Sequence, residues 1–426
     1  MVRAAVVVTG DEVLHGRVAE ANAAHLCAWL ESRGVVPHGI EVVPDELPRI
    51  GAAVAGRIAE GIELVLVTGG LGGTHDDLTM EAVAAAVGAG YRLDPEALVM
   101  VEASVAALRV PGWAVDPAVR AEANRKQATL PEGARVLPPV GTAPGCVLRA
   151  GASLVVVLPG PPVELQPMWE RAATEDPDVR ALLAGRAEGR RVLRLGGVVE
   201  TQMIEALRDL DPAVVAGARV GICARYGELE VTVADAGAPG AAAALTHALR
   251  DRFGASLYSE DGSTLVQVLG GRLVAAGHTL AVAESCTAGM VGARLTELAG
   301  ASAWFLGGVL SYANAVKRDQ LGVPQELLDA HGAVSAECAT AMAQGVRERL
   351  GADWGLSITG IAGPDGGTAE KPVGTVYVGV AGPGVDEVRH HLLRGSRDRI
   401  RSQATAVALH LLRVHVPEVP SGDAPV

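Results

Sequence analysis

The chain has 426 residues, a formal net charge of −13 and a hydrophobic content of 49%. This length predicts two or three domains, each with an ample core, and the acidic balance argues against direct nucleic-acid binding, because a phosphate backbone needs a basic face. The five scattered cysteines form no CxxC pair, the longest apolar runs have the length of a strand, and the N-terminus runs straight into a strand. We therefore expect a cytoplasmic protein with reduced thiols, without a signal peptide or membrane span.

The N-terminal part alternates between strand and helix patterns. Strands are predicted over residues 4–9, 35–43, 62–68 and 153–158, and helices over 22–33 and 47–60, with a polar helical stretch over 95–127. Strands separated by helices of this length predict crossover units in a parallel sheet. We expect an α/β domain over residues 1–172.

Two further units follow along the chain. Residues 173–258 contain short strand patterns at 191–198, 217–224 and 228–234 with two helical stretches, which predicts a small α+β module. From residue 259 the alternation returns, with helices over 264–276 and 287–298 and strands over 279–283, 304–310, 355–359 and 375–380. We expect a second α/β domain over 259–415 and a disordered Pro-rich tail over 416–426.

A glycine-rich loop, TGGLGGTHDD, follows the strand ending at residue 68. Its glycines, Gly69, Gly70 and Gly72, allow backbone amides to approach a phosphate, and Asp76 and Asp77 are suited to holding a divalent cation there. The alternative is a tight turn whose two carboxylates begin a helix. Two later loops, over 141–145 with Thr142 and over 158–162 before Glu164, supply candidate walls for a nucleotide site at the carboxyl edge of the sheet.

A second motif, AESCTAG at residues 283–289, lies where a buried strand is expected to end and a helix to begin. The Ser285 hydroxyl there would face the positive end of a helix, whose amides could stabilise an oxyanion. A capping role for Ser285 or Thr287 is the alternative, and Cys286 competes as nucleophile because a thiol at a helix N-terminus has a lowered pKa.

Lysine is rare in this chain, which has 33 arginines and three lysines, Lys126, Lys317 and Lys371. A lysine can lose its proton when desolvated, whereas arginine stays protonated, so a retained lysine is a candidate base. Lys317 lies five residues after Tyr312 in the motif SYANAVK, and we expect both to face the pocket of Ser285. The alternative is a solvated helix lysine.

The C-terminal third contains two further candidate elements. The motif TGIAGPDGG at 359–367 places Thr359 and Gly360 directly after a strand, where small residues can close on a phosphate or ribose, and Lys371 could pair with that charge. Arg397, at the start of the last predicted helix, could bind an anionic substrate or cap the helix.

The motifs AESCTAG, SYANAVK, HGAVS, TGIAGPDGG and EKPVGT, in this order, closely resemble those of the CinA family. The N-terminal TGGLGGTHDDLT, GTAPG and LPGPP resemble its MoaB/MogA-like half, and residues 173–258 resemble its KH-type middle domain. This resemblance implies a nicotinamide-nucleotide amidase with Ser285 as nucleophile, assisted by Lys317 and Tyr312. Thr359 and Arg397 would complete the site, with Cys286, Thr287, Gly360 and Lys371 as further substrate contacts.

The resemblance also implies an N-terminal, metal-dependent ADP-ribose pyrophosphatase with Asp76 and Asp77 as metal ligands. We expect a divalent metal in that domain, no cofactor for the amidase, nicotinamide mononucleotide and ADP-ribose as small-molecule partners, and a homodimer. Two alternatives stay open: a non-catalytic nucleotide sensor linked to competence or DNA damage, and a pterin-nucleotide transfer role for the N-terminal half. The chain departs from the family pattern at four positions: Gly73 for Pro, His75 for a basic residue, Ala288 for Gly, and Ser396 for Asp.

Overall fold

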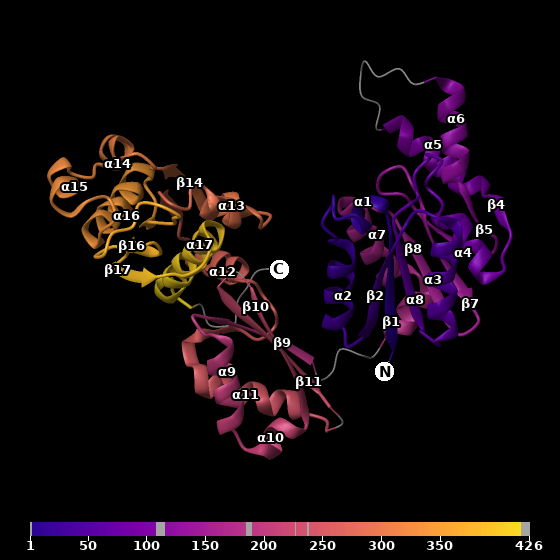
Figure 1. The fold of residues 1–426 in the computed structure, drawn as a ribbon, viewed down its shortest axis with the longest axis horizontal. Coiled ribbons are helices and arrows are strands. Elements are labelled where there is room, and N and C mark those ends of the chain that lie inside the picture. Colours follow the sequence, from indigo (N-terminus) through magenta and orange to yellow (C-terminus); the bar gives the residue numbers. More distant parts are fainter. Residues whose placement is uncertain (1, 108–115, 185–189, 226, 237, 419–426) are drawn as a thin grey trace. The chain divides into compact units, whose positions relative to one another are not determined.

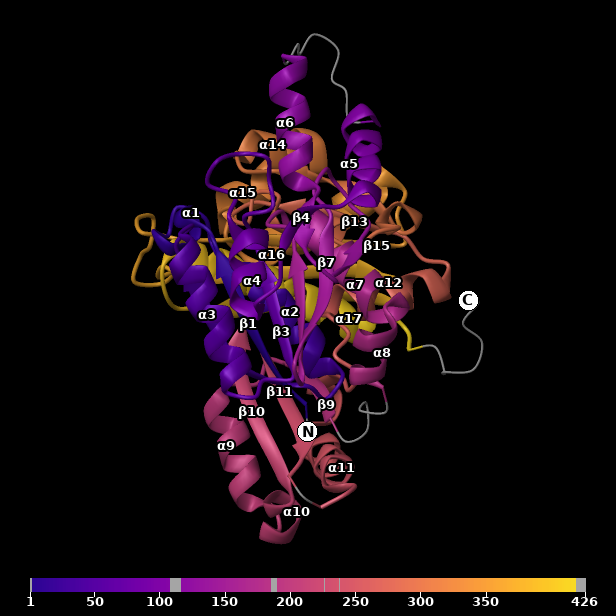
Figure 2. The same ribbon diagram turned by 90° about the vertical axis from the view of Figure 1, so that its right-hand side faces the viewer.

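The computed structural model describes the chain except residues 1, 108–115, 185–189, 226, 237 and 419–426. The chain forms two compact units, Met1–Glu188 and Gly189–Val426. Figures 1 and 2 show the elements of each unit from two directions. Among the described helices, none combines the length and the apolar character that crossing a membrane requires.

The first unit is built on a six-stranded sheet of order β2-β1-β3-β8-β7-β6. The four strands β2, β1, β3 and β8 are parallel, as predicted, whereas β7 and β6 continue the sheet in antiparallel fashion. The strands of this sheet are β1 (Arg3–Thr9), β2 (Val36–Val43), β3 (Leu64–Thr68), β6 (Arg135–Leu137), β7 (Gly145–Ala150) and β8 (Ser153–Leu158), and a small hairpin pairs β4 (Tyr91–Leu93) with β5 (Thr129–Pro131).

Helices cover both faces of this sheet because its strands alternate their buried side chains between two cores. Val6 and Val8 of β1 pack with α2, α7 and α8, while Ala5 and Val7 pack with α3, α4 and α5. The predicted helical stretch 95–127 consists of α5 and α6, and its residues 108–115 lie outside the described part. The helices are α1 (Asp11–Leu14), α2 (Asn22–Ser32), α3 (Leu47–Ala59), α4 (Thr79–Val87), α5 (Pro95–Ala107), α6 (Pro117–Gln127), α7 (Pro162–Glu175) and α8 (Pro177–Leu183).

The second unit contains two sheets. An antiparallel sheet of order β10-β11-β9-β12 packs against α9 and α11. A five-stranded sheet has the order β14-β13-β15-β16-β17, in which β14, β13 and β15 are parallel and β16 and β17 are antiparallel. The strands are β9 (Arg190–Gly196), β10 (Ala218–Arg225), β11 (Glu228–Asp235), β12 (Leu257–Ser259), β13 (Leu280–Glu284), β14 (Phe305–Leu310), β15 (Trp354–Gly360), β16 (Thr375–Gly382) and β17 (Val385–Leu392).

The five-stranded sheet also lies between two helical layers. One core joins it to α12, α13 and α17, and another joins it to α14, α15 and α16. The helices of this unit are α9 (Glu200–Asp209), α10 (Pro212–Ala216), α11 (Ala241–Phe253), α12 (Leu265–Ala276), α13 (Met290–Thr296), α14 (Asn314–Leu321), α15 (Gln325–His331), α16 (Ala336–Leu350) and α17 (Arg397–His415).

Helix α17 connects the two sheets of the second unit. Its half-buried His410 lies beside β9, where a side chain on Gly196 would overlap the imidazole, and the Tyr258 ring packs edge-on at 5.1 Å between centroids. Arg413, further along α17, donates to the Ala255 carbonyl at 2.8 Å. These contacts fix α17, whose second turn reaches the loop over residues 285–289 through Arg401.

Two local features differ from the sequence expectations. The helix expected from residue 287 begins only at Met290, and residues 285–289 form a loop. The tail expected from residue 416 is ordered at its start, because Val416 is 1% exposed and packs in the core of the five-stranded sheet, and Glu418 pairs with Arg272. The rest of that tail, residues 419–426, lies outside the described residues.

Candidate active sites

Ser285 and Lys317 meet in the second unit. Ser285 directly follows β13, and its amide donates to the Ile358 carbonyl of β15 at 3.0 Å, which fixes the start of the loop. Lys317, on α14, is 1% exposed, and its Nζ lies 3.2 Å from the Ser285 Oγ. The two side chains are therefore in contact, as the sequence reasoning expected, and the buried Lys317 is not the solvated helix lysine of the alternative.

The surroundings of Lys317 favour its neutral form. Burial lowers the pKa of this amine from its ordinary value, and no carboxylate of the described residues is among the groups that influence it. Its Nζ lies 2.6 Å from the Ser311 carbonyl and 3.4 Å from the Tyr312 carbonyl. A neutral amine can donate its two protons to these carbonyls and keep its lone pair for the Ser285 hydroxyl proton, which is the arrangement of a general base.

Cys286, the rival nucleophile, lies in a different environment. Its side chain is 4% exposed, and burial raises the pKa of the thiol to about 11. The expected lowering depended on a helix N-terminus at this position, but α13 begins four residues later. A buried thiol with a raised pKa is mostly protonated near neutrality and is a poor nucleophile.

Tyr312 does not take the expected place beside the lysine amine. Its side chain is 62% exposed, and its hydroxyl accepts a hydrogen bond at 3.2 Å from Arg397, while the backbone carbonyl of Tyr312 is what Lys317 contacts. The other arm of Arg397 donates to the Gly363 carbonyl at 2.7 Å. Tyr312 and Arg397 thus form an exposed polar pair, and a proton relay through the tyrosine is not part of this geometry.

Three of the remaining predicted residues lie at the HGAVS segment, and the fourth, Thr287, lies in the loop after β13. Thr359 and Lys371 both bind the HGAVS segment: the Thr359 hydroxyl donates to the Ala333 carbonyl at 2.7 Å and the Lys371 amine to the His331 carbonyl at 2.8 Å. Gly360 is the last residue of β15, beside them. Thr287 is fully buried, and its hydroxyl finds no hydrogen-bond partner among the described residues.

Glu284 is a site residue that the sequence reasoning missed. Its carboxylate, 1% exposed, accepts from the amides of Gly289, Val291 and Gly292 at 2.9–3.1 Å. It thereby satisfies the unpaired N–H groups at the start of α13. The only sequence signal was an acidic residue ahead of a predicted helix, which does not reveal that the chain bends back over that carboxylate.

The glycine-rich loop of the first unit borders a cavity of about 390 Å³ at the carboxyl ends of β1, β3 and β8. Gly69 and Gly70 line it with positive φ angles of 104° and 62°, and a side chain at either would overlap Thr9 or Thr79. Each glycine is therefore required by the close approach of this loop to Thr9 and Thr79, and phosphate binding by the loop stays a prediction. Gly72 and Thr142 do not line this cavity: Gly72 abuts Asp77, and the Thr142 hydroxyl accepts from Gln127 at 3.0 Å.

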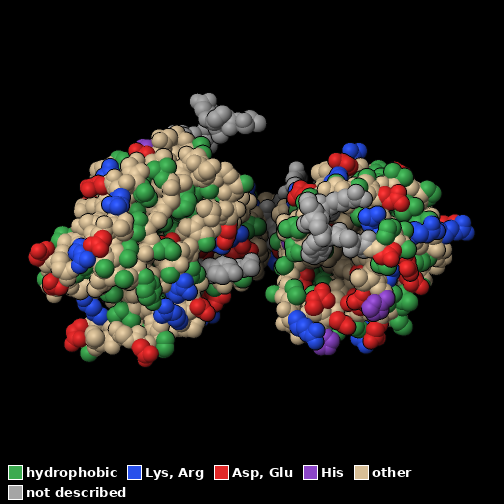
Figure 3. All heavy atoms as spheres, turned by 90° about the horizontal axis from the view of Figure 1, so that it is seen from above, with side chains coloured by type: hydrophobic (Ala, Val, Ile, Leu, Met, Phe, Trp, Pro, Cys, Tyr) green, Lys and Arg blue, Asp and Glu red, His purple; other side chains and the backbone are tan. Residues whose placement is uncertain are grey.

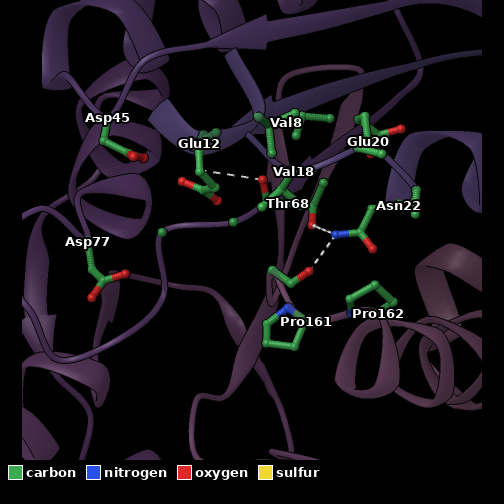
Figure 4. A pocket seen from close by; sticks show the side chains of 18 of the residues that line it. Val8, Glu12, Val18, Glu20, Asn22, Asp45, Thr68, Asp77, Pro161 and Pro162 are labelled. Atoms are coloured by element: carbon green, nitrogen blue, oxygen red, sulfur yellow. Dashed lines mark hydrogen bonds between the residues drawn. The ribbon is translucent and has the colours of Figure 1, made fainter. Parts of the chain in front are cut away.

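Asp76 and Asp77 line the same cavity, together with Asp45 (Figure 4). Both lie in the loop before α4, not within the helix, and both carboxylates accept from Thr74, with 2.6 Å between the Thr74 hydroxyl and Asp77. The Thr74 hydrogen bond lowers the pKa of Asp76, whereas burial and neighbouring carboxylates raise that of Asp45.

These carboxylates fit a cation that is also held by substrate. Within the described part of the chain, no three His, Cys, Asp or Glu side chains are grouped to hold a metal by themselves. A Mg²⁺-like ion commonly takes one or two carboxylates and completes its shell with water and phosphate oxygens, so the pair Asp76 and Asp77 on one cavity is compatible with such an ion.

Asn22 is a second residue that the sequence reasoning missed. It begins α2, is 9% exposed, and its amide donates to the Gly160 carbonyl at 2.6 Å and to the Thr68 hydroxyl at 3.1 Å. Figure 4 shows it across the cavity from Asp77. Asn22 thus ties the loop after β8 to the end of β3, two of the cavity walls.

Two family models match the chain, one in each compact unit. Residues 262–416 match the family model "CinA C-terminal domain", and residues 5–178 match "Probable molybdopterin binding domain". A CinA-like protein of Mycolicibacterium gilvum is 45% identical over 96% of this chain and 98% of its own length. The chain belongs to the CinA family. A CinA-like protein of Mycobacterium avium is 46% identical with the same coverage.

One solved structure similar to this CinA chain is that of the competence/damage inducible protein CihA from Agrobacterium tumefaciens. It is 37% identical, covers 36% of this chain and 96% of its own, and has a TM-score of 0.34.

The structure shows how this CinA chain accommodates two of its departures from the family pattern, Gly73 and Ser396. Gly73 abuts Ala123 of α6, where a Cβ would lie 2.6 Å from the alanine Cβ, so the glycine allows this close approach. Ser396 caps α17 by accepting from the Arg399 amide at 3.4 Å, so a cap is kept without a carboxylate.

Ala288 is the third departure and carries backbone strain. Its φ is +49°, in the left-handed region that costs a residue with a Cβ about 1–2 kcal/mol. We expect Ala288→Gly to raise the free energy of unfolding by about 0.5–1 kcal/mol, since the relief exceeds the entropic cost of glycine. Urea denaturation of the full chain measures this, with Ala293→Gly inside α13 as the control that should destabilise. An Ala288→Gly chain less stable than wild type would show that the left-handed conformation carries no strain.

Proposed function

We propose that the second unit hydrolyses the carboxamide of nicotinamide mononucleotide, giving nicotinate mononucleotide and ammonia. The observation that carries this proposal is the Ser285 hydroxyl 3.2 Å from the buried Lys317 amine. A serine paired with a desolvated lysine is an activated nucleophile suited to acyl transfer, and it needs no metal.

The reaction would proceed in two balanced steps. Neutral Lys317 takes the Ser285 proton as the serine oxygen bonds to the carboxamide carbon, and the protonated lysine then gives a proton to the leaving nitrogen, so that ammonia departs and a nicotinoyl ester remains. Water then attacks the ester with Lys317 again as base, which frees the acid and restores the serine.

The nucleotide part of the substrate accounts for the exposed polar pair. The Tyr312 carbonyl contacts the Lys317 amine and the Tyr312 hydroxyl contacts Arg397, so this pair lies beside the serine and lysine, and a guanidinium is well suited to a phosphate. Lys371 adds a second positive charge beside the HGAVS segment. These groups would select a phosphorylated amide over free nicotinamide.

For the first unit we propose metal-dependent hydrolysis of ADP-ribose to AMP and ribose 5-phosphate. The cavity that Gly69 and Gly70 line together with Asp76 and Asp77 supports this proposal. A divalent cation held by these two carboxylates would neutralise the pyrophosphate charge, while the loop amides bind its oxygens.

Asp77→Asn is expected to lower ADP-ribose hydrolysis at least about 100-fold, because it removes one of the two charges that hold the cation. Ammonia release from nicotinamide mononucleotide is the internal control and should not change, since that site lies in the other compact unit. A chelator should separate the two activities in the same way. Unchanged ADP-ribose hydrolysis in Asp77→Asn would exclude this residue as a metal ligand.

The same assays distinguish the non-catalytic alternative. A chain that binds both nucleotides by calorimetry but releases neither ammonia nor AMP would be a nucleotide sensor. The acidic surface does not favour direct contact with DNA: on the face shown in Figure 3, Lys and Arg side chains are scattered among Asp and Glu.

A further inference from the structure

The loop from Ser285 to Gly289 is held on one side by a residue from a distant helix. Arg401, on the second turn of α17, donates from Nε to the Cys286 carbonyl at 3.0 Å and from Nη2 to the Thr287 carbonyl at 2.8 Å. A planar guanidinium that binds two successive carbonyls fixes the orientation of both peptide groups, which a single point charge could not do.

The geometry of these peptide groups determines in which direction the N–H groups of Cys286 and Thr287 point. In a trans peptide the C=O and the following N–H point in opposite directions, so the bond from Arg401 to the Cys286 carbonyl turns the Thr287 N–H away from the guanidinium. The Ser285 carbonyl accepts from the Ala288 amide at 3.2 Å. Because this carbonyl and the Cys286 N–H belong to one trans peptide, the bond turns the Cys286 N–H away from Ala288.

Neither of these amides is bonded to another described residue. The Thr287 N–H has no backbone or side-chain acceptor, and the Cys286 N–H contacts only the sulfur of its own side chain, a weak acceptor, whereas the amides of Ser285, Ala288 and Gly289 are all bonded to other residues. Two adjacent amides without a strong acceptor next to a nucleophile are the usual composition of an oxyanion hole.

We propose that Arg401 is a positioning residue that holds the Cys286 and Thr287 amides as the oxyanion-binding donors of the amidase, an inference that rests on the proposed deamidation. Glu284 fixes the far end of the same loop through the amides of Gly289, Val291 and Gly292. The loop is thus clamped by a carboxylate on its N–H groups and by a guanidinium on its C=O groups.

Arg401→Gln is the direct test, with nicotinamide mononucleotide as substrate. Because oxyanion donors act mainly in the transition state, we expect kcat to fall about 10- to 100-fold with KM within about threefold of wild type. The kcat of Arg401→Lys, whose side chain has one donor group instead of the fork of a guanidinium, should lie between those of wild type and Arg401→Gln. The matched control is Arg399→Gln, two residues earlier on α17, where the side chain is exposed and makes no hydrogen bond to a described residue.

Two further readouts separate positioning from general structural support. Added guanidinium at tens of millimolar should restore part of the kcat of Arg401→Gln, and the pH profile of kcat should keep its wild-type midpoint, since Lys317 is untouched. Full activity in both Arg401 variants, or a loss of kcat in the folded Arg401→Gln chain that added guanidinium does not restore, would overturn the proposal. An inactive wild-type chain would instead refute the deamidase function itself.

Discussion

Ser285→Ala should release ammonia from nicotinamide mononucleotide at least about 10³-fold more slowly than the wild-type chain, while still binding the nucleotide. The substitution removes the oxygen that attacks the carboxamide but leaves Arg397, Lys371 and the clamped loop in place. The loss should therefore fall on kcat, and ammonia electrode measurements under saturating substrate report it directly.

Cys286→Ala is the matched control for this loss. The thiol is buried and the pKa of Cys286 is raised to about 11, so its removal should leave kcat within about threefold of wild type. If Cys286→Ala were the inactive variant and Ser285→Ala the active one, the nucleophile would be the thiol, and the role assigned to the serine would be wrong.

Lys317→Arg should also lose about 10²-fold or more in kcat, because arginine keeps the charge but does not give up its proton. The larger guanidinium must also fit a site that is 1% exposed, so Lys317→Met is needed as a second variant of similar length without charge or base. Both should be inactive if the lysine acts as the base. Activity in Lys317→Arg with none in Lys317→Met would show that the residue serves only as a cation.

The pH dependence follows from the same lysine. Burial lowers the pKa of Lys317, and only the neutral amine accepts the serine proton. Hence kcat should rise with pH through the lowered pKa of Lys317. It should reach its plateau below the pH at which an ordinary, solvent-exposed lysine loses its proton. A flat profile across this range would argue that another group takes the proton.

Much of the fold could be predicted from the sequence because its strands are short apolar runs between helical stretches. The parallel strands of the two mixed sheets are of this kind. Strand β17 was missed because its sequence, VDEVRHHL, is mostly polar and it lies at the sheet edge, where little of it is buried. The start of α13 was placed too early because Ala288 and Gly289 adopt left-handed φ angles of 49° and 96°, which end the helical conformation there.

The candidate site was predictable where one residue type was informative by itself. Lys317 was recognised because lysine is rare in the chain, and Ser285 because it follows a buried strand. Arg401 is one of 33 arginines, and its importance arises only from the fold that brings α17 to the loop after β13. Tyr312 was placed too close to the lysine because a spacing of five residues does not determine on which side of the turn a side chain lies.

The most direct measurement is a product assay on the purified full-length wild-type chain and on Ser285→Ala, prepared in parallel and incubated with nicotinamide mononucleotide in the presence of a chelator. We predict that the wild-type chain releases one ammonia for each nicotinate mononucleotide formed and that Ser285→Ala binds the substrate but forms neither product. Equal ammonia release by both chains, or binding without any release by the wild-type chain, would contradict the assignment of Ser285 as the nucleophile of an amidase.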